Sequence, residues 1–379
     1  MRSNSVAVLA TRVAFVFAAL SVLAGCAGGP EKPKPRELPA PSGQVTARVA
    51  WNAKLGVVDF PLEIKVNGDT IVVASTDGLV ASYNAVTGTE IWRTSVGTHI
   101  SAGVGSDGRF SSVVTRSNEL VVLDAGREMW RKKLLAQTFT APLVAGGRVF
   151  LLSADRSVSA FDVESGRKLW VQQRPGESLV LRQTGILLAI GDTLVAGVSG
   201  RLLGFSPANG SIRWDVPIAS PRGTNDIERM VDLVGRAARD GNVVCVRAFQ
   251  AALGCVDAAR GSLLWTKVAS GATGLSSDEK YVFGVETDSK IVAWRRSDGE
   301  RAWLSDGFQF RNLTAPLVIG RSLAIGDEAG YVHLISRDDG AVFTRVSTDG
   351  SAVLTAPVLA GGTLVVVTRN GGVFGFRPE

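Results

Sequence analysis

The sequence predicts an all-β fold, an eight-bladed β-propeller with four-stranded antiparallel blades that an N-terminal strand closes. Three observations predict it. Tryptophans recur on one frame, glycines recur four residues before most of them, and short β-branched runs fill the stretches between, without a convincing helical period. A repeat of about forty residues that holds four short strands is typical of a propeller blade.

The tryptophans set the period of the repeat. Seven of the eight recur at intervals of 38 to 51 residues, at Trp51, Trp92, Trp130, Trp170, Trp214, Trp265 and Trp303. Six of these follow a glycine by four residues, as in Gly88 to Trp92 and Gly166 to Trp170. We expect each glycine to allow a tight turn with positive φ, and each tryptophan to fill the wedge between neighbouring blades. The eighth, Trp294, takes a place that other units give to core aromatics, and we expect it in the core.

The number of units predicts how the ring closes. Seven units end near residues 92, 130, 170, 214, 265, 303 and 344, and Thr344 replaces the tryptophan in the last of them. The remaining stretch supplies three strands and stops at Phe376, whereas Val45 to Trp51 is a lone strand that carries a tryptophan. This strand is expected to complete the eighth blade, because closure removes two free sheet edges. Seven blades is the alternative.

A separate segment precedes the repeats. Arg2 and Arg12 precede the apolar run Val13–Leu23, which is short for a membrane-spanning helix and typical of a signal peptide. Leu23-Ala-Gly-Cys26 follows and resembles the bacterial lipoprotein signal, in which the cysteine thiol becomes lipidated. That resemblance implies an acylated Cys26 and, since Ala27 is not the aspartate that retains such proteins at the inner membrane, an outer-membrane destination. An ordinary secretory signal with an incidental cysteine is the alternative.

A proline-rich stretch joins this segment to the repeats. Residues 28–42 contain five prolines and charges of mixed sign. This composition predicts an extended, semi-rigid tether that does not pack. The expected organisation is therefore a lipoprotein signal peptide at 1–25, a lipidated cysteine and linker at 26–43, and the propeller at 44–379.

Composition and motifs argue against several function classes. The 41 Lys and Arg residues exceed the 35 Asp and Glu residues by only six and do not cluster, which argues against a nucleic-acid partner. The two histidines and three cysteines are badly spaced for a zinc site. Gly103–Gly108 matches a dinucleotide fingerprint as a string, but no helix follows it. We predict no enzyme activity, no catalytic residue, no metal and no cofactor.

The blade motif also resembles that of quinone-cofactor (pyrroloquinoline quinone, PQQ) dehydrogenases, which often carry adjacent cysteines beside the cofactor. Here Cys245 and Cys255 are ten residues apart. A two-residue turn at Gln250-Ala251 would direct them to opposite faces of the hairpin, so we expect buried free thiols, although the compartment permits a disulfide. A quinoprotein oxidoreductase is the alternative function from a different class.

Two irregular segments interrupt the frame. Pro221–Asp232 stretches one tryptophan interval to 51 residues and ends in Ile-Glu-Arg-Met-Val-Asp, and Ser178–Arg182 reads Ser-Leu-Val-Leu-Arg. They are similar to the Ile-Asp-Arg-Leu-x-Asp and Leu-x-Leu-Arg segments of the BamB family, the propeller lipoproteins of the outer-membrane β-barrel assembly (BAM) machinery. Together with the lipoprotein signal and the eight-bladed frame, the resemblance runs from Cys26 to Phe376.

This resemblance implies a non-catalytic scaffold, lipid-anchored at the periplasmic face of the outer membrane. Such a scaffold binds a periplasmic POTRA domain of BamA, joins the other BAM subunits and assists folding and insertion of β-barrel proteins, and unfolded outer-membrane proteins are a further candidate partner. The contacts carried over by position are Leu179, Leu181, Arg182, Arg229 and Asp232. Family members often have a second acidic residue two places after the aspartate, where this chain has Val234.

The residues alone leave alternatives open for these contacts. Leu179 and Leu181 share one face of an extended segment and could both face a blade core. Arg229 and Asp232 are three residues apart and could pair with each other. An envelope propeller lipoprotein with another partner is the remaining alternative for the whole chain.

Overall fold

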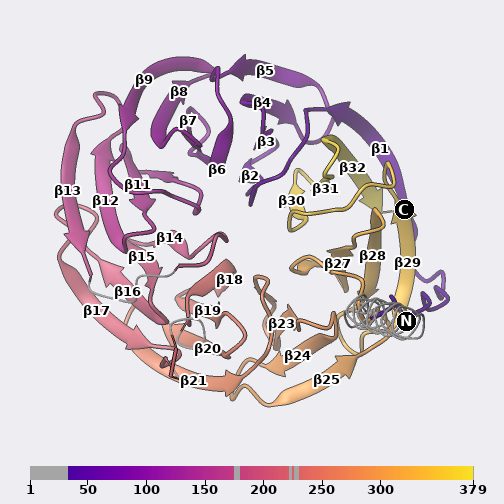
Figure 1. The fold of residues 1–379 in the computed structure, drawn as a ribbon. Coiled ribbons are helices and arrows are strands. Elements are labelled where there is room, and N and C mark those ends of the chain that lie inside the picture. Colours follow the sequence, from indigo (N-terminus) through magenta and orange to yellow (C-terminus); the bar gives the residue numbers. More distant parts are fainter. Residues whose placement is uncertain (1–32, 175–179, 222–223, 226–229, 379) are drawn as a thin grey trace, which may run out of the picture. The chain divides into compact units, whose positions relative to one another are not determined.

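The body of the protein is a ring of four-stranded sheets around a central axis (Figure 1). The computed structural model describes residues 33–174, 180–221, 224–225 and 230–378, and from Arg36 onward the chain is one compact unit. No helix occurs in these ranges, so none of them holds a helical segment able to cross a membrane. The signal-peptide assignment and Cys26 lie outside the described residues.

The strands follow one another in chain order from the centre of each blade to its rim (Figure 1). Blades 1 to 4 consist of β2 (Lys65–Asn67), β3 (Thr70–Ala74), β4 (Leu79–Asn84) and β5 (Glu90–Ser95); β6 (Ile100–Ser106), β7 (Phe110–Thr115), β8 (Glu119–Asp124) and β9 (Arg127–Lys133); β10 (Leu143–Ala145), β11 (Arg148–Leu152), β12 (Ser157–Asp162) and β13 (Lys168–Gln173); β14 (Leu187–Ile190), β15 (Thr193–Val198), β16 (Arg201–Phe205) and β17 (Ile212–Pro217).

Blades 5 to 8 repeat this order, and the last one takes its outermost strand from the other end of the chain. They consist of β18 (Leu233–Asp240), β19 (Val243–Ala248), β20 (Ala252–Asp257) and β21 (Ser262–Val268); β22 (Ser276–Ser277), β23 (Tyr281–Val285), β24 (Ile291–Arg295) and β25 (Arg301–Ser305); β26 (Leu317–Ile319), β27 (Ser322–Gly326), β28 (Tyr331–Ser336) and β29 (Val342–Ser347); β30 (Val358–Ala360), β31 (Thr363–Val367), β32 (Gly372–Pro378) and β1 (Ala47–Lys54).

The eighth blade confirms the predicted closure. Strand β1 pairs antiparallel with β32, and Trp51 lies opposite Gly375. The two ends of the ring are thereby joined by a backbone ladder, and neither end strand keeps a free edge at the join. The eight-bladed prediction is confirmed, and the seven-bladed alternative is wrong.

The strand order gives the ring two different faces. Each crossover, from the outermost strand of one blade to the innermost strand of the next, lies on the same face as the hairpin between second and third strands. We call this the crossover face. The hairpins between first and second strands and between third and fourth strands lie on the opposite face, the hairpin face, because successive strands alternate in direction.

On the hairpin face, each repeated tryptophan contacts the blade that follows its own; blade 7, with Thr344 at this position, is the exception. Trp170 Nε1 donates to the carbonyl oxygen of Pro207 at 2.9 Å, and Trp303 Nε1 donates to that of Arg337 at 3.0 Å. Each turn glycine lies against the tryptophan of the preceding repeat: a Cβ on Gly166 would lie 2.8 Å from Trp130 Cδ2. The repeated glycines and the repeated tryptophans of the sequence therefore contact each other across the boundary between neighbouring blades. Trp294 is buried, as predicted.

The proline-rich stretch packs more than its composition suggests. Arg36 N–H donates to the carbonyl oxygen of Gln309, Arg345 Nη2 donates to that of Pro39, and Ser42 N–H donates to that of Val342. The prediction of a tether without packed contacts is therefore wrong for residues 36–43, which lie against the outer parts of blades 6 and 7. Backbone carbonyls of a proline-rich segment remain available as acceptors, and arginines of the blades use them.

The cysteine prediction is also wrong. The turn between β19 and β20 contains three residues, 249–251, rather than two, so Cys245 and Cys255 lie directly opposite each other. Their Cα atoms are 4.0 Å apart, and the two residues form a disulfide. One extra turn residue shifts the register by one and brings both side chains to the same face.

Candidate functional site

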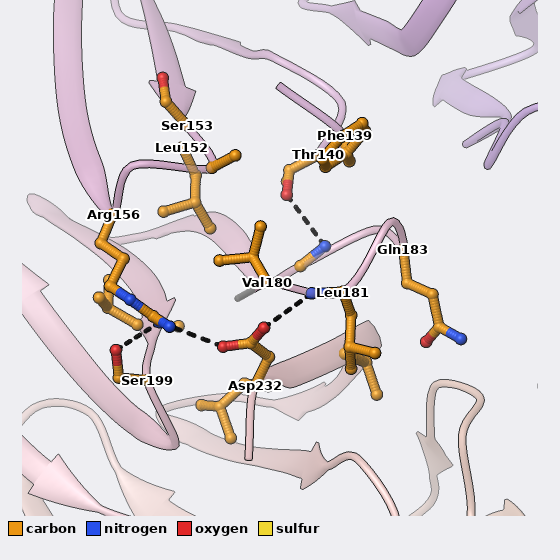
Figure 2. Close-up of a pocket in the computed structure, with 16 residues that line it drawn as sticks. Phe139, Thr140, Leu152, Ser153, Arg156, Val180, Leu181, Gln183, Ser199 and Asp232 are labelled. Carbon is orange, nitrogen blue, oxygen red and sulfur yellow. Dashed lines mark hydrogen bonds and ion pairs between the residues drawn. The ribbon is translucent and has the colours of Figure 1, made fainter. Parts of the chain in front are cut away.

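The described parts of the two irregular segments meet on the crossover face, where Val180, Leu181 and Asp232 help to line a small cavity. The crossovers 134–142, 174–186 and 218–232 follow blades 2, 3 and 4, and the hairpins at 153–156 and 199–200 lie beside them. Figure 2 shows the side chains converging on a cavity of about 60 Å³. Its lining combines apolar side chains with polar ones and with the ion pair Arg156–Asp232. The large apolar residues are Phe139, Leu152, Val180, Leu181, Val198, Leu233 and Val234.

Asp232 connects the two irregular segments. Its Oδ2 accepts the backbone N–H of Leu181 at 3.0 Å, and its Oδ1 lies 3.2 Å from Nη1 of Arg156 (Figure 2). Arg156 Nη1 also donates to Ser199 Oγ at 2.5 Å. The Arg156 side chain is 7% exposed and that of Asp232 17%. One ion pair, removed largely from water, thus joins the hairpins of blades 3 and 4 to both crossovers.

The segment around Leu181 is held at a second point. Gly185 N–H donates to Thr140 Oγ1 at 3.0 Å, and Gly235 N–H donates to the carbonyl oxygen of Thr184 at 2.7 Å. Residues 181–185 are therefore attached at both ends, to Asp232 on one side and to Thr140 and β18 on the other. Hydrogen bonds at both ends reduce the conformational freedom that a partner would otherwise have to restrict on binding.

Arg182 projects from this fixed segment. Its side chain is exposed, and its guanidinium carbon lies 5.5 Å from the centre of the half-buried Phe139 ring. That contact is within the range of a cation–π interaction. Leu181 is half-buried and lines the cavity. An exposed guanidinium thus lies beside a leucine and a phenylalanine.

The structure brings together three of the predicted contact residues, Leu181, Arg182 and Asp232. Leu179 and Arg229 lie outside the described residues, so the alternative Arg229–Asp232 pair stays a prediction. The partner of Asp232 that the structure describes is Arg156, which sequence reasoning missed. Val234 is buried on β18 and contributes to the cavity wall, where an apolar side chain suits its surroundings.

Another buried pair, in blade 7, could suggest catalysis. His333 Nε2 lies 3.0 Å from Asp327 Oδ2, and both side chains are buried. Burial lowers the pKa of His333 and outweighs the neighbouring carboxylate. The His333 Nδ1 atom has no hydrogen-bond partner among the described residues, and the ring packs against Phe308. A catalytic triad would require a hydroxyl or thiol bonded to that ring, so the pair has the environment of a core interaction.

The described ranges contain no group of three or more His, Cys, Asp or Glu residues placed to hold a metal ion. The crossover face offers the exposed cation of Arg182, apolar contacts from Leu181 and Phe139, and a backbone that hydrogen bonds hold in place at 181–185. These are the components of a recognition surface.

Comparison with known proteins identifies the family. The family model described as "Outer membrane protein assembly factor BamB" matches residues 76–305. The chain belongs to the BamB family. BamB of Burkholderia pseudomallei is 35% identical over 96% of both chains, and BamB of Bordetella pertussis is 33% identical over 98% of both. The chain therefore matches these BamB proteins over nearly their whole length.

Solved structures agree with this fold. The crystal structure of BamB from Moraxella catarrhalis has a TM-score of 0.80 and 24% identity, covering 88% of this chain and 100% of that one. A quinohemoprotein alcohol dehydrogenase from Comamonas testosteroni has a TM-score of 0.68 at 13% identity, covering 87% of this chain and 76% of that one. Both likenesses are of fold alone.

Proposed function

We propose that this protein is a non-catalytic assembly factor for outer-membrane proteins, acting as the BamB subunit of the BAM complex. It binds BamA and thereby assists folding and insertion of β-barrel proteins. One observation of the structure supports this most directly: Asp232 fixes the segment 181–185 on the crossover face, so that Arg182 and its apolar neighbours form a prepared surface. Family membership supplies the partner.

The chemistry of this surface suits docking to a folded domain. An arginine can make directional, charge-assisted hydrogen bonds with carboxylates or carbonyls, while the adjacent Leu181 and Phe139 can exclude water around them. We infer that the partner element is a POTRA domain of BamA. Leu179 and Arg229 are proposed to extend the same contact, as their positions in the sequence imply.

We further propose that Cys26 is acylated and anchors the protein at the periplasmic face of the outer membrane. The sequence Leu23-Ala-Gly-Cys26 supports this. Since residues 36–43 pack on the blades, only the residues between Cys26 and Arg36 separate the proposed anchor from the packed part of the chain. A tether of this length holds the propeller close to the membrane surface, and stable anchoring requires two or more acyl chains.

Crosslinking in whole cells tests the proposed partner. A photoreactive amino acid at position 182 should capture BamA, whereas the same amino acid at position 260 should not. Arg260 is also an exposed arginine, but it lies on the hairpin face. Capture of BamA from position 260 with none from position 182 would contradict the proposed orientation.

A further inference from the structure

The seam between blades 7 and 8 lacks the contact that the other seams share. In blade 6, Trp303 lies opposite Ala293 in the strand register and reaches the turn of blade 7. In blade 7 the same register position is Thr344, which lies opposite Leu334. Blade 8 has no hairpin between its third and fourth strands, because its fourth strand is β1 from the other end of the chain. An indole ring at position 344 would therefore find no turn glycine to contact in blade 8.

A cavity of about 190 Å³ lies at this seam. Apolar side chains from both blades form most of its wall: Val45, Ala47, Ile319, Leu334, Leu364 and Phe376. Paired residues of antiparallel strands place their side chains on the same face, so the side chain of residue 344 lies on the face that Leu334 presents to blade 8. The cavity is thus beside the position that an indole ring fills at the other seams.

The one charged side chain among the described lining residues already has partners. Arg321 Nη2 donates to the carbonyl oxygen of Gln44 at 2.8 Å, and its guanidinium carbon lies 5.2 Å from the centre of the Phe343 ring. None of the described lining residues has a buried side-chain nitrogen or oxygen without a hydrogen bond. A water molecule inside would find few of the two to four polar partners that it needs.

We propose that this cavity is a binding site for a small aromatic compound of the indole class. Apolar cavities of about 150 Å³ stay dry and bind benzene in other proteins, because the ligand restores contacts that the cavity wall lacks. Seven seams of this ring use an indole ring from the chain itself at the corresponding register position. At the eighth seam, between blades 7 and 8, the indole ring binds as a separate molecule.

Titration of the purified chain with indole tests the proposal. Calorimetry should give saturable binding at one site per chain, and indole should raise the melting temperature in a concentration-dependent way. The double variant Leu334→Ala/Thr344→Trp recreates the small residue and tryptophan pair of the other blades. It should fill the cavity and weaken indole binding by at least about tenfold, by removing the volume that the ligand occupies.

A matched variant at the neighbouring seam provides the control. Trp303→Ala should lower the melting temperature and create a second indole site, so that two molecules bind per chain. If the double variant fails to fold, Ala47→Leu fills the cavity from β1 with a smaller change and should also weaken binding. Absence of saturable indole binding to the unaltered chain would overturn the proposal, and so would binding that a folded filling variant leaves unchanged.

Discussion

The two faces of the ring differ in how neighbouring blades are joined. On the hairpin face, one kind of contact recurs from seam to seam: a tryptophan of one blade against a turn of the next, accompanied in places by ion pairs such as Arg296–Asp240 and Arg337–Asp278. On the crossover face, the connections differ in length, and the pair Arg156–Asp232 joins elements of several blades.

The exposed apolar side chains differ in the same way. Among the described connections between strands, those with large exposed apolar residues are crossovers, which carry Val57, Leu135, Phe310 and Leu354. The repeated face is thus specialised for stability, and the varied face is where a partner can be recognised. Substitutions on the two faces should separate these roles.

The largest loss of stability is expected from Trp170→Ala. Its ring is 9% exposed, packs against Phe150 and donates to the Pro207 carbonyl of blade 4. Truncation should lower the free energy of unfolding by about 3–5 kcal/mol, because it leaves a cavity at the seam and an unpaired carbonyl. Denaturant unfolding of the purified chain measures this. A loss within experimental error would contradict the role given to the hairpin face.

A smaller loss is expected from Gly166→Ala. A methyl group there would press on the ring of Trp130 of the preceding blade, and φ is already positive at +67°. We expect a loss of about 2–3 kcal/mol in the free energy of unfolding. Gly191→Ala is the matched control, since Gly191 has φ of +56° with open space around its Cα, and it should cost only about 1 kcal/mol. Equal losses would show that backbone strain alone determines the effect.

Asp232→Asn should have a modest effect on stability and a larger one on partner binding. It removes a charge that compensates the nearly buried Arg156, while the amide oxygen can still accept the Leu181 N–H. We expect a loss of about 1–2 kcal/mol in unfolding free energy and several-fold less co-purified BamA. Ser199→Ala removes a neighbouring hydroxyl but leaves the ion pair, and it should retain BamA. Full retention of BamA by Asp232→Asn would contradict a positioning role for Asp232.

The sequence was sufficient for the features that repeat. The tryptophan and glycine frames predicted the eight blades, and the lone tryptophan of the N-terminal strand predicted that β1 completes the last one. Repeated features can be predicted because equivalent positions of the blades pack in the same way and carry similar residue types at a regular spacing.

The features it could not predict are those that occur once. The disulfide depended on whether one turn has two or three residues, and sequence did not distinguish these. Arg156 lies 76 residues from Asp232, and no pattern links the two positions. The packing of residues 36–43 could not be predicted, because their proline-rich composition is equally typical of a linker without packed contacts. Single long-range contacts of this kind leave no periodic signal.

The proposed binding of BamA to the crossover face is tested by comparing Arg182→Glu with Arg260→Glu. Both arginines are exposed, so each change should alter unfolding free energy by no more than about 0.5 kcal/mol. Co-purification of BamA from membranes should fall strongly for Arg182→Glu and remain at the level of the unaltered chain for Arg260→Glu. Undiminished BamA with a folded Arg182→Glu variant, or a loss confined to Arg260→Glu, would contradict binding through the crossover face.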